Sequence, residues 1–314
     1  MQQESYYAQT VLDSRQASGD QDLETLQACP LCDQNQFRIL DASANICECA
    51  CCGYIFDNPR PTIEALVAFY SNPTKYDSWL SEELARNLLW ERRLRQVLRI
   101  RKPGSLLDVG AGIGQFLDLA RPYFSEVQGT EVSASAVEIA RKRYGLELIQ
   151  GEIHAINFGC TYFDNITVYH VLEHVPDPKL LIQKCASLLS DRGVLVIAVP
   201  NEMHSLRTRA RGVLNAMGIL KSGNIGRLGL PRIVLDGTLA EIHLSHFTPQ
   251  VLARLVKSCG LSVVSNTLDP YYAATGFTKW KEGVYYRCCG ILQTLARVNL
   301  YETILIVARK ERFN

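Results

Sequence analysis

The 314-residue sequence has almost no excess charge of either sign and no long apolar run. Its 33 lysines and arginines balance 32 aspartates and glutamates, so a broad basic face for nucleic acid is not expected. The longest apolar run, GVLVIAVP at 193–200, is far shorter than the roughly 20 residues of a membrane-spanning helix. Residues 1–13 lack the basic start and apolar centre of a secretion signal. We therefore expect a soluble, cytoplasmic protein without a membrane or nucleic-acid partner.

The sequence also lacks low-complexity tracts and internal repeats. With 47% hydrophobic and 21% charged residues, it does not have the composition of a disordered chain. Its length suits one large domain, or one domain with an appendage, built around a sizeable core.

Cysteine is abundant in one short segment, where six of the 11 cysteines fall between positions 29 and 52. Without a secretion signal a disulfide framework is not expected. Cys29 and Cys32 form one CxxC pair, and Cys49 and Cys52 form a second pair, with 16 residues between the two pairs. This spacing is typical of a zinc ribbon, in which four thiolates complete a structural Zn²⁺ site. The other two cysteines of the segment, at positions 47 and 51, lack CxxC spacing.

The hydrophobic pattern divides the chain into four parts. We expect a loose N-terminus over 1–28, the zinc ribbon over 29–57, a helical cap over 58–102 and an α/β domain over 103–314. In the last part, strands alternate with amphipathic helices, which predicts a doubly wound, mostly parallel sheet covered on both faces. Residues 201–246 interrupt the alternation and are interpreted as a lid insertion.

Local signals suggest where individual elements begin and end. Pro61 is expected in the first turn of a cap helix, where proline is tolerated. Ser133 and Gly145 are expected to open and close one helix, and Gly193 to close another. The stretch LELIQ at 146–150 is predicted to be a buried strand.

The most informative stretch is LLDVGAGIGQFL. A strand that ends in Asp108 is followed by Gly110, Gly112 and Gly114, which allow a sharp turn close to a ligand at the start of a helix. A second strand ends at Glu131, whose carboxylate is placed to accept hydrogen bonds from two ribose hydroxyls. The spacing is GxGxG, whereas a dinucleotide fingerprint reads GxGxxG. The alternative is an ordinary glycine-rich turn without a ligand.

These residues together resemble the class I S-adenosylmethionine-dependent methyltransferases. The resemblance implies a seven-stranded Rossmann-like sheet and a donor site at the glycine loop, with Asp108 beside it and Glu131 on the ribose. It also implies that Glu152 contacts the exocyclic amine of the adenine and that Ile153 packs against the ring. The similarity extends over most of the chain, including the fourth-strand segment FDNITVYHVLEHVPDP.

Four of the six histidines fall in two clusters, YHVLEHV and HLSHF. Methyl transfer from a sulfonium to a hydroxyl requires alignment of the reactants and removal of a proton. The resemblance places the first cluster beside the reacting methyl, and imidazole titrates near neutrality. We therefore predict that His174 is the general base, with Glu173 as its orienting partner or as an alternative base. The alternative role of this pair is to anchor the loop.

The ubiquinone-type O-methyltransferases have a Glu-x-x-Glu-His arrangement at this loop that binds a divalent cation. The corresponding residues here are His170, Glu173 and His174. Two imidazoles and a carboxylate still suit a metal, so a divalent cation at the active site stays open as a second cofactor.

Several residues outside this loop are candidates for the acceptor pocket. His243 and His246 either line the pocket or satisfy backbone groups where the insertion rejoins the domain. Arg207, in the insertion, either attracts an anionic acceptor or lies on a solvated face. Tyr70 either packs in the cap or approaches the donor.

The resemblance therefore predicts a methyltransferase acting on a small-molecule acceptor. The N-terminal ribbon resembles that of sugar and natural-product methyltransferases, which favours O-methylation of a sugar, nucleotide-sugar or natural-product hydroxyl. One alternative is an RNA or protein methyltransferase that docks through the ribbon, although Arg38 is the only basic residue between the two CxxC pairs. Another is a donor-binding protein without activity. C-methylation stays open, and the sequence identifies neither the acceptor nor the oligomeric state.

Overall fold

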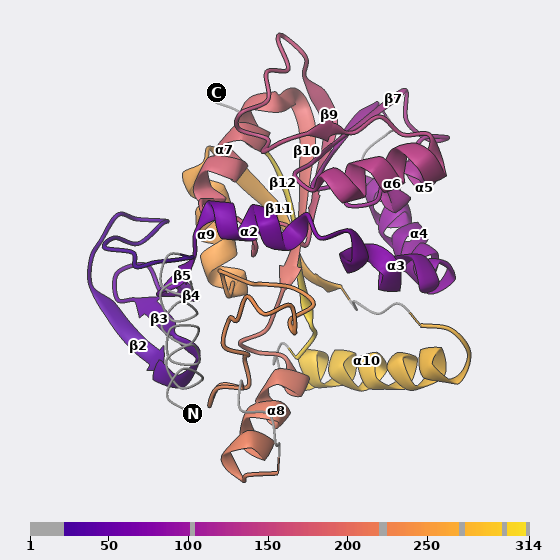
Figure 1. The fold of residues 1–314 in the computed structure, drawn as a ribbon. Helices are drawn as coiled ribbons and strands as arrows, with labels where there is room; N and C mark the ends of the chain where they lie inside the picture. The colour runs from indigo at the N-terminus through magenta and orange to yellow at the C-terminus, as the bar shows by residue number, and fades with distance from the viewer. Residues whose placement is uncertain (1–21, 101–103, 220–224, 270–273, 297–299, 312–314) are drawn as a thin grey trace, which may run out of the picture.

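The computed structural model is built around a seven-stranded sheet with helices on both faces (Figure 1). It describes residues 22–100, 104–219, 225–269, 274–296 and 300–311. The strand order is β11-β12-β10-β9-β6-β7-β8, and β12 alone runs antiparallel to its neighbours. The strands are β6 (Ser105–Val109), β7 (Glu126–Glu131), β8 (Ile149–Gln150), β9 (Phe163–Tyr169), β10 (Leu189–Pro200), β11 (Leu261–Asp269) and β12 (Thr303–Lys310). The predicted doubly wound, mostly parallel fold is confirmed.

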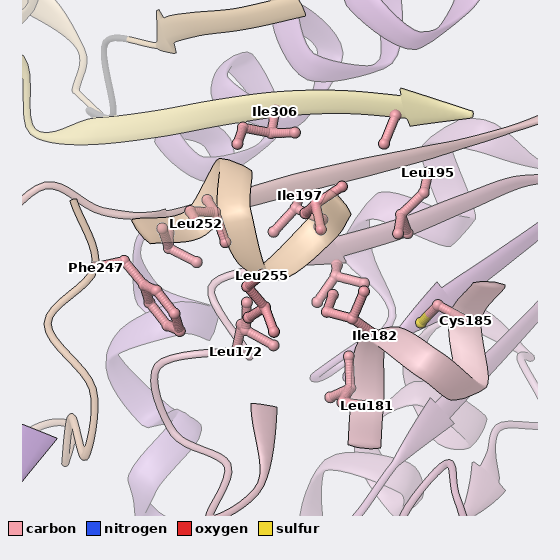
Figure 2. Close-up of a cluster of buried hydrophobic side chains, with 14 of the residues drawn as sticks. Leu172, Leu181, Ile182, Cys185, Leu195, Ile197, Phe247, Leu252, Leu255 and Ile306 are labelled. Carbon is pink, nitrogen blue, oxygen red and sulfur yellow. The ribbon is translucent and has the colours of Figure 1, made fainter. Parts of the chain in front are cut away.

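Strand β10 shows how the sequence builds two cores. Leu195 and Ile197 pack on one face of the sheet, against α7 and α9 (Figure 2). Val194 and Val196 alternate with them and pack on the other face, against α4, α5 and α6. Alternation follows from the two-residue repeat of a strand, and a strand buried on both faces is apolar throughout. These helices are α4 (Glu83–Ile100), α5 (Gln115–Ala120), α6 (Ala134–Tyr144), α7 (Pro178–Leu188) and α9 (Pro249–Ser258).

The carboxyl ends of four neighbouring parallel strands meet at one edge of this sheet. The glycine loop follows β6, Glu131 ends β7, His170 follows β9, and Glu202 comes shortly after β10. In open α/β sheets, ligands bind outside this edge. The topology therefore brings the glycine loop and the first histidine cluster together.

The N-terminal part forms two small sheets. Strands β2, β3 and β4 form an antiparallel three-stranded sheet, and β1 pairs with β5. A short 3₁₀ turn, η1, connects β2 to β3. The elements are β1 (Leu23–Glu24), β2 (Phe37–Asp41), η1 (Ala42–Ala44), β3 (Ile46–Cys49), β4 (Ile55–Asp57) and β5 (Arg60–Pro61).

Two expectations for this region are corrected. The loose terminus was expected to extend to residue 28, but Leu23 lies in β1; residues 1–21 are outside the described part. Pro61 is not in a helix, because it pairs with Leu23 across the two-stranded sheet. The helix begins after Thr62, whose hydroxyl accepts a hydrogen bond from the N–H of Ala65 at 3.3 Å.

The described part of the expected helical cap contains three helices and a 3₁₀ turn, and its longest helix, α4, packs on one face of the sheet. Its elements are α2 (Ile63–Tyr70), the 3₁₀ turn η2 (Pro73–Tyr76), α3 (Asp77–Ser81) and α4. Buried Leu89, Leu94 and Val97 lie on one side of α4, at the spacing of an amphipathic helix.

The 201–246 insertion packs against both the ribbon and the cap. Its Leu230 is buried with Ile46 and Ile55 of the ribbon. Its Ile242 is buried with Leu66 of α2. The insertion also contains a helix that the sequence analysis did not predict, α8 (Leu206–Ala216). The insertion therefore joins the N-terminal part to the α/β domain, and its action as a lid stays a prediction.

Two other element boundaries differ from expectation. Helix α7 ends at Leu188, not near Gly193, because Leu189 is already extended and pairs with Phe163. In contrast, Gly145 caps α6 in the left-handed conformation, as predicted. Strand β8 contains only Ile149 and Gln150, and both are exposed.

A long helix, α10 (Gly276–Ala296), lies between β11 and β12 and was not predicted. Its sequence contains three glycines and several aromatic and β-branched residues, which weaken the helical signal. None of the described helices has the length and apolar content needed to cross a bilayer.

Candidate active site

The glycine loop after β6 has the conformation that its sequence predicts. Gly110 and Gly112 have φ angles of 69° and 56°, in the left-handed region that favours glycine. A Cβ atom at Gly110 would lie 2.4 Å from Val171 of the next loop, and one at Gly112 would lie 2.9 Å from the Trp79 ring. The two positions therefore require glycine both for conformation and for space.

Glu131 is held beside this loop by backbone donors. Its Oε2 accepts a hydrogen bond from the N–H of Gly112 at 2.8 Å, and its Oε1 accepts one from the N–H of Ser133 at 2.9 Å. Burial raises the pKa of Glu131, although these N–H groups oppose the shift. The carboxylate is thus fixed in orientation between the glycine loop and the start of α6.

Asp108 lies at the end of β6 and is buried. The hydroxyl of Thr167 donates to its Oδ1 at 2.6 Å. Burial raises the pKa of Asp108 to about 7, and the nearby negative charge of Glu131 acts in the same direction. A ligand that carries positive charge would stabilise both carboxylates in their ionised form.

The other two predicted donor contacts differ in their surroundings. Glu152 is partly exposed, and its carboxylate lies 3.0 Å from Nε2 of His154. Ile153 is only 4% exposed and packs in the same core as Leu107 and Val109. Little of its side chain is therefore available to a ligand.

The cap contributes a cover over the glycine loop that the sequence analysis missed. Trp79 of α3 lies against Gly112, and the guanidinium of Arg86 stacks 4.0 Å above the Trp79 ring. Arg86 also donates to Oε1 of Gln115 at 2.9 Å. Gln115 occupies the position that a dinucleotide fingerprint gives to its third glycine, and here it connects α5 to the cap.

His170 has a constrained conformation at the end of β9. Its φ of 56° is uncommon for a residue with a side chain. The guanidinium of the buried Arg93 donates to Nε2 of His170 at 2.9 Å, and Arg93 also pairs with Asp269 at 3.2 Å. Burial, and then the charge of Arg93, lower the pKa of His170 well below its usual range. His170, a predicted active-site residue and candidate cation ligand, therefore has its Nε2 lone pair occupied by Arg93.

His174 has one ring nitrogen engaged and the other facing Glu173. Nδ1 lies 2.6 Å from the carbonyl oxygen of Ile242, which can only accept, so Nδ1 carries the proton. The hydroxyl of Tyr70 lies 2.9 Å from the same nitrogen. Burial, and then the charge of His243, lower the pKa of His174 to about 4. The ring is therefore neutral near pH 7, and its Nε2 has a lone pair to accept a proton.

Glu173 lies between the two histidines of its loop. It is fully buried, and neither carboxylate oxygen has a hydrogen-bond partner in the described part of the chain. Its Oε1 lies 3.3 Å from Nδ1 of His170 and 3.8 Å from Nε2 of His174. Burial raises the pKa of Glu173 to about 8, against the opposing charge of His243.

The second histidine cluster forms a buried chain of charges that reaches the ribbon. Nδ1 of His243 and Nδ1 of His246 donate to the two oxygens of Glu202, at 2.8 and 2.7 Å. Nε2 of His246 donates to Asp57 of β4 at 2.8 Å. Because both its ring nitrogens donate to carboxylates, His246 is an imidazolium. The expected role of merely satisfying backbone groups does not describe these side-chain contacts.

Sequence reasoning missed the acidic members of this chain. Glu202 comes two residues after β10, a strand that was predicted. Its position just beyond the carboxyl end of a parallel strand was the only sequence signal that could have marked it as a site residue. Asp57 lies in the ribbon, 189 residues from His246, and nothing local indicates the pairing.

The structure also changes the predicted metal ligands at the active site. Glu173, His174 and His243 each offer one ligand atom, and these atoms lie within 4.8 Å of one another. His243 thus replaces His170 in the expected set. Arg207, the other weak prediction, pairs with Glu282 at 2.6 Å and with Glu302 at 3.0 Å.

The four predicted zinc ligands are gathered at one point. Cys29 and Cys52 have Sγ atoms 3.6 Å apart, as do Cys32 and Cys49, and all four sulfurs lie within 4.8 Å. Sulfurs around a tetrahedral Zn²⁺ are about 3.8 Å apart. Cys51 is exposed and is not part of this group. The residues present therefore fit a Cys₄ zinc site.

The His246 contacts predict a pH-dependent stability. Burial alone would lower the pKa of His246, but the hydrogen bonds that it donates to Asp57 and Glu202 raise its pKa to about 9. Because the folded-state pKa exceeds the unfolded one, this stabilisation is complete below about pH 6.5 and is lost as pH rises through about 9, a change of about 3 kcal/mol. In urea unfolding at pH 6.5 and 9.5, His246→Gln should lose less stability than the wild type. His154→Gln, at an exposed histidine, should retain the wild-type difference in unfolding free energy between the two pH values. If this difference is the same in all three proteins, the assignment to His246 is wrong.

Comparison with known proteins identifies the family. Residues 76–266, which carry the glycine loop, Glu131 and both histidine clusters, match the model of a methyltransferase domain family. The chain belongs to this methyltransferase family. The fold and the family together make it a class I S-adenosylmethionine-dependent methyltransferase.

Individual relatives support this conclusion. A ubiquinone biosynthesis O-methyltransferase of Histophilus somni is 34% identical over 167 residues, which are 49% of this chain and 66% of the relative. The O-methyltransferase cnsE of Penicillium expansum is 27% identical over 46% of this chain and 56% of the relative. The matches thus span less than two thirds of these relatives.

A solved structure supports the fold. The magnesium protoporphyrin IX methyltransferase of Synechocystis PCC 6803, crystallised with bound SAH, superposes with a TM-score of 0.51 at 11% identity. It covers 80% of this methyltransferase and all of the Synechocystis chain.

Proposed function

We propose that this methyltransferase transfers the methyl group of S-adenosylmethionine to a hydroxyl of a small-molecule acceptor. The observation that carries the proposal is the tautomer of His174. Its Nδ1–H is fixed on the carbonyl of Ile242, which leaves a neutral Nε2 to accept the hydroxyl proton. The names of the two relatives above, both O-methyltransferases, support oxygen as the acceptor atom.

The donor would bind at the glycine loop. Gly110, Gly112 and Gly114 let the backbone approach the methionine moiety, and Glu131 would exchange its present backbone contacts for ribose hydroxyls. Asp108 would lie close to the positively charged part of the donor. Glu152 and Ile153 are assigned to the adenine, although Ile153 is mostly enclosed by the core.

The reaction is an in-line displacement. The acceptor oxygen forms a bond to the methyl carbon as the bond from that carbon to the sulfonium breaks, and the sulfur leaves as a neutral thioether. The hydroxyl proton goes to Nε2 of His174. Removal of the proton by a positioned base contributes typically 10²–10⁴-fold to the rate.

The residues also fit a divalent cation as a second cofactor. Glu173 has no hydrogen-bond partner in the described part, and Nε2 of His243 lies 3.5 Å from a carboxylate oxygen of Glu241. With His174 they would form a two-histidine, one-carboxylate set, in which the cation would take the Nε2 lone pair and so would be an alternative to His174 acting as the general base. A cation bound there would polarise the acceptor hydroxyl.

A sugar, nucleotide-sugar or natural-product hydroxyl is the acceptor that we favour within this class. The ion pairs of Arg207 with Glu282 and Glu302 weaken the case for an anionic acceptor at that residue. RNA docking through the ribbon is disfavoured, because Arg38 pairs with Glu48. A panel of candidate acceptors assayed with labelled donor would test this assignment.

Donor binding is tested through Glu131. Replacing Glu131 with alanine should weaken binding of S-adenosylhomocysteine by about 1–3 kcal/mol, because the ribose would lose a buried hydrogen-bond partner. Isothermal titration calorimetry measures this change. Glu126→Ala, on the exposed start of the same strand, should bind as the wild type does. Unchanged affinity in Glu131→Ala would remove this residue from the donor site.

A further inference from the structure

Helix α10 presents an apolar stripe to solvent. Figure 1 shows α10 at one end of the molecule, away from the central sheet. The exposed members of the stripe are Phe277 (68%), Trp280 (63%), Val284 (40%), Ile291 (58%) and Leu295 (79%). At 100° per residue they fall within a sector of about 60°. The helix instead uses Tyr286 and Cys289, on its opposite side, to pack against the protein.

The exposed charges on α10 are positive. Lys279, Lys281 and Arg287 form no ion pair with any described residue. The single acidic residue of the helix, Glu282, is paired with Arg207 at 2.6 Å. The helix therefore combines an apolar stripe with uncompensated positive charge.

Helix α8 extends the same end of the molecule. Arg207 near its start joins it to α10, through the pair with Glu282 and by lying 4.5 Å above the ring of Tyr285. Helix α8 has no acidic residue, and it carries two further arginines, Arg209 and Arg211. Its last turn and the following residues expose apolar side chains, namely Val213 (59%), Met217 (66%) and Ile219 (56%). We call these two helices the α8–α10 end.

We propose that the α8–α10 end docks on an anionic lipid bilayer. Aromatic and aliphatic side chains on one helix face enter the interface between headgroups and acyl chains, and flanking lysines and arginines attract the phosphates. Charge complementarity selects this occupant over a second copy of the chain, because two such ends would bring like charges together. The sequence expectation of no membrane partner came from spanning helices and does not concern a helix that lies on the surface.

This docking would orient the active site toward the bilayer. Helix α8 begins four residues after Glu202, which contacts both histidines of the second cluster. Helix α10 follows β11, and Asp269 at the end of β11 pairs with Arg93. The α8–α10 end is therefore continuous with the edge of the sheet that carries the catalytic loop. The inference concerns binding and does not depend on the acceptor.

Vesicle binding tests the proposal with the full chain. The protein should co-sediment with phosphatidylcholine vesicles that contain about 30% phosphatidylglycerol. Its affinity for vesicles of phosphatidylcholine alone should be at least about tenfold lower. Trp280 is the exposed tryptophan, whereas Trp79 and Trp90 are partly buried. Its emission should shift to shorter wavelength on binding and should be quenched by brominated lipids.

Matched substitutions separate this surface from others. Ile291→Ser with Leu295→Ser should reduce anionic-vesicle binding at least about tenfold, whereas Ile39→Ser on the ribbon, at a residue that is 68% exposed, should not. Lys281→Glu should weaken binding about five- to tenfold, and Lys257→Glu on α9 should have little effect. Circular dichroism checks that each variant is folded. Equal sedimentation with neutral and anionic vesicles would overturn the proposal, as would absence of binding. A concentration-dependent dimer that Ile291→Ser with Leu295→Ser abolishes would overturn it in favour of a second copy.

Discussion

Replacing His174 with alanine should reduce kcat by about 10²–10⁴-fold while affinity for S-adenosylhomocysteine is retained. The imidazole is held by the carbonyl of Ile242 and the hydroxyl of Tyr70, which both contact Nδ1. Alanine removes the proton acceptor without touching Glu131 or the glycine loop. Loss of turnover without loss of donor binding separates a base from a residue that merely supports the donor site.

The experiment pairs turnover with calorimetry. Turnover is measured with labelled donor on an acceptor from the panel, and S-adenosylhomocysteine binding is measured in parallel. His204→Ala is the matched control, since this histidine lies in the insertion and shows no contact with Glu173 or His174 among the described residues. If His174→Ala turns over at the wild-type rate, the residue is not the base. If both variants lose turnover equally, the insertion as a whole has been disturbed.

The same assignment predicts the pH profile. The pKa of His174 is lowered to about 4, so the neutral form that accepts a proton persists through the neutral range. As pH falls, kcat/KM should therefore decline only on approach to about pH 4. The measurement is kcat/KM as a function of pH over the range in which the protein stays folded. An apparent pKa near 6.5 that disappears in His174→Ala would place the ring in water rather than in this buried site.

The fold and the donor loop were predictable because their signals are local. The central strands β6 and β10 are apolar runs, and the order β-loop-helix around Asp108, Gly110 and Gly112 lies within one short stretch. The CxxC spacing likewise identifies Cys49, and not Cys47, as a zinc ligand. The sulfur of Cys49 is indeed one of the four that lie together.

The electrostatics of the site were not predictable in the same way. Arg93, which occupies Nε2 of His170, is 77 residues away in the cap, and within its helix it resembles any other arginine. Asp57 reaches His246 only because β4 of the ribbon packs against the end of the insertion. These side chains ionise and pair according to tertiary burial, which hydrophobic periodicity does not encode.

Loss of one zinc ligand is the second large effect that we expect. Replacing Cys52 with serine should abolish stoichiometric zinc and lower the free energy of unfolding by about 5 kcal/mol, because metal binding supplies folding energy to a segment with little core of its own. Burial raises the pKa of the Cys52 thiol to about 11 without a metal, so this thiol would stay protonated at neutral pH in the absence of the ion. Cys51→Ser provides a control one residue away, at an exposed cysteine outside the cluster.

The consequence should extend to the active site through β4. The N–H of Asp57 donates to the carbonyl oxygen of Leu244 at 3.1 Å, and Tyr54 hydrogen-bonds Ser245. These contacts hold the segment that carries His243 and His246. Cys52→Ser should therefore lower turnover as well as stability, and donor binding should be less affected, since Glu131 and the glycine loop do not contact the ribbon in the described structure.

Zinc content by inductively coupled plasma mass spectrometry, urea unfolding and turnover can be compared across the two variants. If Cys51→Ser loses zinc and Cys52→Ser retains it, the ligand assignment is wrong; if Cys52→Ser loses zinc but keeps full turnover, the ribbon does not support the catalytic histidines.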